Sequence, residues 1–167
     1  MAGIFKAYDI RGVYGAEINE DVVFDIARAF VTFLGCKKIA VGRDCRVSSE
    51  PLFRAFAKGA TALGADVVDL GLCSTPISYY ANAKLGCDAS VMITASHNSK
   101  QYNGLKLCRA NAVPISGATG IADIERIVAE KSFAPAAATP GTVSKADVGA
   151  DYAALDRKST RLNSSHR

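Results

Sequence analysis

The stretch Ala89–Lys106, ASVMITASHNSKQYNGLK, decides how this chain of 167 residues folds. Its first five residues are mostly apolar and include β-branched side chains, a composition typical of a buried strand. The polar segment that follows places Ser96 and His97 directly after that strand. In an open α/β sheet, functional groups gather at the carboxyl ends of the strands. The stretch therefore predicts a buried strand over 89–93, followed by a functional loop.

The composition of this loop favours chemistry on phosphate. Asn98, Asn103 and Gly104 tolerate left-handed backbone conformations, which a loop needs when it folds its amide N–H groups around an anion. Lys106 follows Ser96 by ten positions, so its ammonium is expected beside the serine hydroxyl. A hydroxyl surrounded by backbone donors, a histidine and a lysine suits phosphoryl transfer, in which catalysis is mainly positioning and charge stabilisation.

Strand-like and helix-like segments alternate along the rest of the chain with the spacing of βα units. This alternation predicts an α/β fold with a mainly parallel sheet, mixed at its edge, that is sandwiched between helices. Arg43 and Arg46 follow the second strand and, if the strands are parallel, are expected at the same edge as Ser96. Helices are predicted over residues 19–34, 48–63, 75–84 and 120–130, and strands over 38–41, 66–70, 89–93 and 105–109.

Charge and composition indicate neither a nucleic acid nor a membrane partner. Residues 1–156 hold 16 basic and 16 acidic side chains, because four of the 20 basic residues lie within the last eleven positions. No apolar run approaches the roughly 20 residues that a bilayer-spanning helix needs. The five cysteines are widely spaced and odd in number, which favours reduced thiols over a disulfide framework. We therefore expect a cytoplasmic protein.

The domain organisation is expected to be simple. Residues 1–150 are predicted to form one α/β domain with its own core. From Ser132 onward alanine, proline, threonine and glycine dominate, which indicates a loose connection. The last ten residues, KSTRLNSSHR, show neither helical nor strand periodicity. We interpret residues 151–167 as a truncated linker with a foreign, disordered tail.

Three ordered motifs carry a family resemblance: FKAYDIRG (residues 5–12), VGRDCRVSSE (41–50) and TASHN followed by YNGLK (94–106). Together with KLCRANAVPISGATGI (106–121), they resemble the α-D-phosphohexomutases, in particular the bacterial phosphomannomutase and phosphoglucomutase branch. The resemblance covers residues 1–150 and corresponds to the first of the family's four domains. It therefore implies that the chain is a fragment of a longer enzyme.

The resemblance implies that Ser96 is a phosphoserine that gives its phosphoryl group to a hexose phosphate. The family interconverts the 1- and 6-phosphates of mannose or glucose through a hexose 1,6-bisphosphate, so these hexose phosphates are the implied partners. Lys106 resembles the family's general acid or base near the sugar hydroxyl, and His97 belongs to the same catalytic motif. The residues that resemble substrate- or phosphate-binding positions are Tyr8, Arg11, Asn98 and Asn103. Ser99 departs from the family pattern, in which many members carry proline.

Other interpretations of the same residues stay open. Ser96 also fits a loop serine that satisfies local backbone groups, or the nucleophile of a serine hydrolase, although the chain has no GxSxG turn. His97 either binds phosphoryl oxygens or orients the loop through a backbone carbonyl. Lys106 also fits a solvated lysine, and Arg11 fits an ion pair with Asp9. The other structural alternatives are a pair between Arg43 and Asp44 and a purely loop-shaping role for Asn98, Tyr102 and Asn103.

The resemblance also implies Mg²⁺, held by the phosphoryl group on Ser96 together with the aspartates of a DGDGDR loop in the family's second domain. No such loop occurs in this sequence. A lone seryl oxygen cannot hold a cation that requires near-octahedral oxygen coordination. The isolated chain is therefore expected to show negligible mutase activity. Two alternatives are a noncatalytic sugar-phosphate-binding module and a nonfunctional truncated product with exposed partner surfaces.

Overall fold

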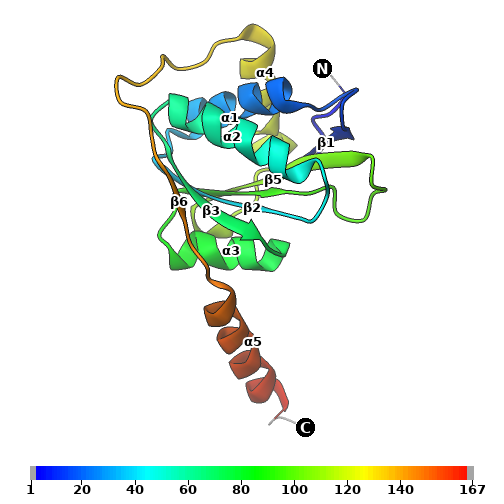
Figure 1. The fold of residues 1–167 in the computed structure, drawn as a ribbon, viewed down its shortest axis with the longest axis vertical. Helices are drawn as coiled ribbons and strands as arrows, with labels where there is room; N and C mark the ends of the chain where they lie inside the picture. The colour runs from blue at the N-terminus through cyan, green and yellow to red at the C-terminus, as the bar shows by residue number, and fades with distance from the viewer. Residues whose placement is uncertain (1–2, 165–167) are drawn as a thin grey trace.

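Alternating strands and helices form one six-stranded sheet with helices on both of its faces (Figure 1). The computed structural model describes the backbone of residues 3–164 and the side chains of residues 3–158. The strands are β1 (Ile10–Val13), β2 (Lys38–Arg43), β3 (Asp66–Leu72), β4 (Ala89–Ile93), β5 (Tyr102–Arg109) and β6 (Val143–Lys145). The α-helices are α1 (Glu20–Leu34), α2 (Ser49–Ala62), α3 (Thr75–Lys84), α4 (Ile121–Glu130) and α5 (Gly149–Ser164). The predicted α/β class is confirmed.

The sheet has the strand order β1-β5-β4-β2-β3-β6. The strand β2 pairs in parallel with β3 and β4, and β6 continues the parallel part beyond β3. The strand β5 runs antiparallel to both β4 and β1. The sheet is therefore mixed, with a parallel part and an antiparallel edge, as the sequence predicts. Because β2, β3 and β4 are parallel, their carboxyl ends meet at one edge, which is where a ligand site is expected.

The main core lies between the sheet and the helices α1, α2 and α4, and a smaller cluster lies under α3 on the other face (Figure 1). The rings of Phe30 and Phe56 join α1 and α2, with their centroids 6.1 Å apart. Gly59 allows these helices to approach closely, because a Cβ there would lie 2.5 Å from the Phe24 carbonyl oxygen. Within residues 3–164, no helix combines the length and the apolar character that crossing a bilayer requires.

The predicted start and stop signals of the first helix are confirmed. The Asn19 side chain accepts a hydrogen bond from the Val22 N–H at 3.0 Å, which satisfies one of the free amides at the beginning of α1. Gly35 ends the helix in a left-handed conformation, with φ of 62°, and its N–H donates to the Val31 carbonyl. Residues directly beside the helix therefore cap both ends of α1, Asn19 through its side chain and Gly35 through its backbone.

The strand β5 begins at Tyr102, three residues before the predicted start at Leu105. The extra residues pair with β1, a strand that the sequence analysis did not predict: Asn103 lies opposite Gly12, and Gly104 lies opposite Arg11. Asn103 and Gly104 are therefore extended strand residues, and the prediction that they belong to the loop is wrong. Pairing with a distant segment has overridden their local preference.

The segment after residue 142 is more regular than the sequence predicts. The short strand β6 pairs with β3, and α5 runs from Gly149 to Ser164 and extends away from the sheet (Figure 1). The Gly149 N–H donates to Asp147 Oδ1 at 2.8 Å, and Asp151 pairs with Lys84 at 3.1 Å. Good helix formers such as alanine, leucine, arginine and lysine support α5, although it carries no apolar stripe that periodicity could detect. Residues 165–167 of the predicted disordered tail lie outside the described residues, and the foreign origin of the tail stays a prediction.

The buried thiols lower the stability of the fold at alkaline pH. The five cysteines are free thiols, and burial raises the pKa of Cys36 to about 12 and that of Cys108 to about 11. The same thiols in the unfolded chain have a pKa near 9.0. Below that value the folded and unfolded states are both protonated, so no stability is lost. Above it only the unfolded chain releases protons, which favours unfolding.

We therefore expect the free energy of unfolding to fall as the pH rises above 9, by about 1 kcal/mol for each of these thiols near pH 10. Urea unfolding near pH 8 and near pH 10 measures this loss. The variant Cys36→Ala should lose less stability between the two conditions than the parent chain. The matched control Cys45→Ala, at an exposed thiol, should leave the difference unchanged. Equal losses in the parent and in Cys36→Ala would contradict the assignment.

Candidate active site

Ser96 occupies a strained and exposed position immediately beyond β4. Thr94 and Ala95 are buried, whereas Ser96 is exposed, and its φ of 58° lies in the left-handed region. Its N–H donates to Thr94 Oγ1 at 2.9 Å. Among the side chains that the structure describes, none forms a hydrogen bond with Ser96 Oγ. A left-handed conformation costs a non-glycine residue about 1–2 kcal/mol, so the fold holds a free hydroxyl in a conformation that serine disfavours.

This strain can be measured with two variants that both remove the hydroxyl. Ser96→Gly relieves the left-handed strain, whereas Ser96→Ala retains a Cβ and therefore keeps it. We expect Ser96→Gly to be more stable than Ser96→Ala by about 1 kcal/mol in urea unfolding. Equal stabilities would show that the loop relaxes freely around this residue.

Arg46 holds the loop after β4 in place. Its Nη1 donates to the carbonyl oxygens of Ser99 (2.8 Å) and Tyr102 (3.1 Å). Its Nη2 donates to those of Ser96 (3.3 Å) and Asn98 (2.7 Å). The predicted position of Arg46 at the same edge as Ser96 is confirmed. No local sequence signal indicates that its guanidinium binds the loop itself.

The first turn of α2 and the residue before it support the same loop through three hydrogen bonds. Asp44 accepts hydrogen bonds from Arg46 Nε at 3.1 Å and from Ser49 Oγ at 2.6 Å. Asn103 Nδ2 donates to Ser48 Oγ at 2.7 Å and to Ser49 Oγ at 3.0 Å. Asn103 is fully buried, and its Oδ1 accepts from the Gly104 N–H. Its predicted contact with substrate is not available in this arrangement, because its polar atoms already tie the loop to α2.

A cleft of about 690 Å³ opens beside Ser96 at the carboxyl ends of β2, β3 and β4. Ser96, His97 and Lys100 line it from the loop, and Ser74 and Thr75 line it from the beginning of α3. His97 is exposed, and no hydrogen bond from it to another described residue is present, so it does not orient the loop through a carbonyl here. Lys100 likewise forms no ion pair within residues 3–158. Lys100 is not among the predicted site residues, since nothing in the motif marks it.

Lys106 lies in a second cleft, together with Tyr8 and Arg11. Its Nζ is 3.9 Å from Asp9 Oδ2, and no hydrogen bond joins it to Ser96 among the described side chains. The partner that the structure gives its ammonium is therefore Asp9, and the expected position beside the serine hydroxyl stays a prediction. Strand register explains the contact with Asp9: Leu105 lies opposite Ile10, so the next residue on β5 comes beside Asp9.

Arg11 connects the two clefts. Its Nη1 donates to Asn98 Oδ1 at 3.0 Å, and its Nη2 pairs with Asp9. The predicted ion pair with Asp9 is therefore present, together with a contact to the Ser96 loop that the sequence analysis did not foresee. Arg11 Nε is buried without a hydrogen-bond partner among the described residues. Tyr8 is 81% exposed, so its ring is accessible to a ligand in the second cleft.

Arg43 has a structural role at the edge of the sheet. Its Nη1 is 2.5 Å from Asp69 Oδ1, its Nε is 2.7 Å from Glu50 Oε2, and its guanidinium lies 4.4 Å from the centre of the Phe53 ring. The suggested pair with Asp44 is wrong, because Asp44 binds Arg46 and Ser49 instead. With two carboxylates already bound, Arg43 is not placed to receive a phosphate.

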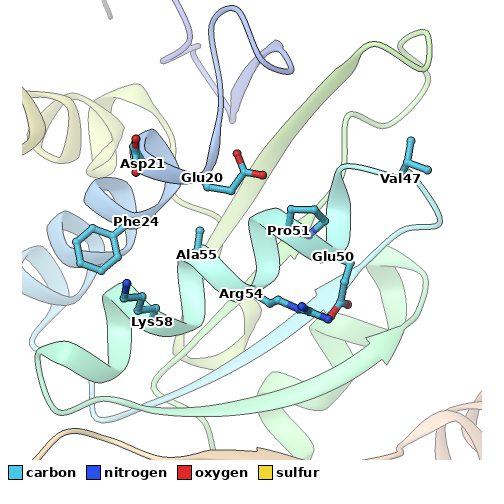
Figure 2. A pocket seen from close by; sticks show the side chains of 9 residues that line it. All are labelled: Glu20, Asp21, Phe24, Val47, Glu50, Pro51, Arg54, Ala55 and Lys58. Carbon is cyan, nitrogen blue, oxygen red and sulfur yellow. The ribbon is translucent and has the colours of Figure 1, made fainter.

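A further hollow of about 750 Å³ lies between the outer surfaces of α1 and α2 (Figure 2). Phe24, Pro51 and Ala55 form its apolar part, and charged residues surround them. Most of the hollow's charged groups have protein partners, such as the pair between Arg54 and Glu50 at 2.9 Å. This hollow shares only Val47 with the cleft beside Ser96, so it is not part of the candidate active site.

The described residues do not form a magnesium site around Ser96. Within residues 3–158, no group of three or more histidine, cysteine, aspartate or glutamate side chains is arranged to hold a metal ion. Asp44 is the carboxylate that lines the cleft, and Arg46 and Ser49 already occupy its two oxygens. Because Mg²⁺ requires near-octahedral oxygen coordination, we assign no step to a metal held by these residues.

Comparison with known proteins places this site in a family. The family model described as phosphoglucomutase/phosphomannomutase, alpha/beta/alpha domain I, matches residues 2–135. A phosphomannomutase of Escherichia coli is 48% identical over 149 residues, which cover 89% of this chain and 33% of that protein. A phosphomannomutase of Klebsiella pneumoniae is also 48% identical over 149 residues, which cover 95% of its length. The chain thus spans about a third of the length of the E. coli relative.

A solved structure agrees with these sequence matches. The crystal structure of a phosphoglucomutase/phosphomannomutase family protein from Burkholderia thailandensis superposes with a TM-score of 0.79 and 36% sequence identity. The superposition covers 89% of this chain and 34% of that protein. The family model matches most of the chain, and the relatives share nearly half of the aligned residues. The chain belongs to the phosphoglucomutase/phosphomannomutase family.

Proposed function

We propose that this chain provides the phosphoryl-carrying loop of a phosphohexomutase, with Ser96 as the residue that gives and receives the phosphoryl group. The observation that carries the proposal is the free, exposed Oγ of Ser96, which the fold holds in a left-handed conformation at the carboxyl edge of the sheet. Strain of this kind persists where the surrounding structure enforces it, and such residues concentrate at functional sites. The family names of the relatives indicate hexose phosphates as the substrate class.

The proposed reaction consists of two phosphoryl transfers. In the first, a hydroxyl oxygen of a hexose monophosphate bonds to the phosphorus on Ser96, and the bond between that phosphorus and Ser96 Oγ breaks. The products are a hexose 1,6-bisphosphate and a free Ser96. After the bisphosphate reorients, Ser96 Oγ takes the other phosphoryl group, so that phosphoserine is restored and the isomeric monophosphate is released. In the first transfer the proton of the sugar hydroxyl passes to Ser96 Oγ, and in the second the proton of Ser96 Oγ passes to the sugar oxygen that is released. Phosphoryl groups and protons therefore balance over the cycle.

The two clefts suggest where the different parts of the substrate bind. We assign the reacting phosphoryl group to the cleft of Ser96, His97 and Lys100, where two side chains without described partners offer N–H donors. Lys106, in the second cleft, is assigned to proton transfer at the sugar hydroxyl, with Asp9 orienting its amine. Tyr8 and Arg11 are assigned to the sugar phosphate itself, and Arg11 couples its position to the loop through Asn98.

The isolated chain is proposed to lack turnover, because its described residues supply neither a magnesium site nor a sugar-recognition loop like that of the family. A chimera tests the proposed function. In it, the 149 matched residues of this chain replace their counterparts in the E. coli phosphomannomutase. We expect the chimera to interconvert mannose 1-phosphate and mannose 6-phosphate, and the isolated chain to show no conversion in the same coupled assay.

The chimera and a calorimetric titration also separate the alternatives. If the isolated chain binds mannose 1-phosphate and the folded chimera has no activity, the noncatalytic binding module is favoured over the mutase. If the isolated chain aggregates or unfolds without cooperativity, it is a truncated product. An active chimera whose phosphopeptide does not contain Ser96 would refute the assignment of the carrier residue.

A further inference from the structure

One guanidinium determines which way the peptide groups of the Ser96 loop point. Arg46 donates hydrogen bonds to the carbonyl oxygens of Ser96, Asn98 and Ser99, and also to that of Tyr102. In a planar trans peptide the C=O and the N–H of the next residue point in opposite directions. A carbonyl that turns toward Arg46 therefore turns the following amide away from it. For the first three carbonyls, the amides concerned are those of His97, Ser99 and Lys100.

These three amides have no partner among the described residues, whereas other amides of the same loop do. The N–H of Asn98 donates to the Ala95 carbonyl at 3.1 Å, and the N–H of Tyr102 donates to the Ser99 carbonyl at 3.0 Å. The free amides belong to the loop that carries Ser96, and His97 and Lys100 line the cleft beside it. Successive amides that point outward from one loop form a concavity suited to an anion.

Arg46 itself has no donor left for a ligand. A guanidinium has five N–H groups, and Arg46 engages four through the loop carbonyls and the fifth, on Nε, through Asp44 at 3.1 Å. Its side chain is only 13% exposed. Asp44 is fixed in turn by Ser49 Oγ and by the Arg46 N–H. Every polar atom of the guanidinium is thus committed to building the loop.

We propose that Arg46 is a positioning residue that presents the amides of His97, Ser99 and Lys100 to the phosphoryl group on Ser96, and that it does so without touching the phosphate. The proposal rests on the proposed function, because it assigns these amides a phosphoryl ligand. In this role Arg46 differs from an arginine that binds phosphate directly, because its guanidinium contacts the loop and not the ligand. A lysine cannot replace it, since three donors on one nitrogen cannot span four carbonyls and a carboxylate.

The test follows the loop amides of the ¹⁵N-labelled chain by NMR while inorganic phosphate is added. In the parent chain, the amides of His97, Ser99 and Lys100 should be ordered and should shift with phosphate. In Arg46→Lys, which keeps the charge, the same amides should lose order, and the dissociation constant for phosphate should rise about tenfold. Arg54→Lys is the matched control, because Arg54 is 76% exposed and its one ion pair among the described side chains is with Glu50. It should behave like the parent chain.

A second variant separates positioning from general stabilisation. Arg46→Ala should lose the phosphate response, and added methylguanidinium should restore it, whereas methylammonium should not. Urea unfolding of each variant shows whether the rest of the domain stays folded. If Arg46→Lys binds phosphate like the parent chain with ordered amides, the proposal is wrong. If the parent amides are ordered but do not respond to phosphate, the proposed function of the loop fails, and the loss of order in Arg46→Lys still reports that Arg46 holds the loop.

Discussion

Replacing Ser96 with alanine in the chimera is expected to lower the interconversion of mannose 1-phosphate and mannose 6-phosphate by roughly 10⁴-fold or more. The proposed reaction passes every phosphoryl group through Ser96 Oγ, so no other described atom can carry the intermediate. The substitution removes one exposed oxygen that makes no hydrogen bond with the described residues, and it keeps the Cβ. The domain should therefore remain folded while turnover disappears.

The measurement combines the coupled assay with mass spectrometry of the loop peptide. The active chimera should carry a phosphoryl group on Ser96, and the alanine variant should carry none. Ser144→Ala is a matched control, because Ser144 is an exposed serine on β6 that lines neither cleft. It should retain turnover within a few fold. Substantial turnover in Ser96→Ala would show that another group carries the phosphoryl intermediate.

Gly104→Ala is expected to destabilise the domain by about 3 kcal/mol or more. A Cβ at this position would lie 2.0 Å from the Ile10 carbonyl oxygen and 3.1 Å from Arg11 Cα. Both atoms belong to the backbone of β1, which pairs with β5 at this point, so no side chain can move aside to make room. The alanine can be accommodated only if β1 shifts away from β5.

The same substitution should also disturb the site, because β1 carries Arg11 to Asn98. Urea unfolding measures the stability, and phosphate titration of whatever folded protein remains measures the loop. Gly3→Ala is the control, since a Cβ there would meet nothing within 4 Å, and it should change the stability by less than about 0.5 kcal/mol. Similar stabilities of the two variants would show that β1 is not held against β5.

The features that could be predicted from the sequence are those that a short segment determines by itself. Asn19 and Gly35 mark the ends of α1 through their own capping chemistry. The apolar run before Ser96 suffices to place the hydroxyl at the edge of the sheet, because a buried strand must end where polar residues begin. The alternation of elements likewise suffices for the α/β class.

The features that could not be predicted depend on register between distant segments. Lys106 faces Asp9 only because β1 pairs with β5 at one particular register, and no local signal specifies that pairing. Arg46 could be placed at the correct edge, but its four carbonyl partners depend on the path of a loop about fifty residues away. Asn103 illustrates the same limit: as a loop residue it suits ligand binding, whereas as a strand residue it is buried against α2.

The attachment of the Ser96 loop to α2 couples the stability of the loop to that of the first turn of the helix. Ser49 binds both Asp44, which holds Arg46 Nε, and Asn103, which follows the loop at the beginning of β5, so the loop and the first turn of α2 stabilise each other. A ligand that orders the loop must then lower the population of the opened turn, because coupling between two equilibria is reciprocal. Slower hydrogen exchange of the amides at the amino end of α2 would consequently report that a ligand is bound at the Ser96 loop.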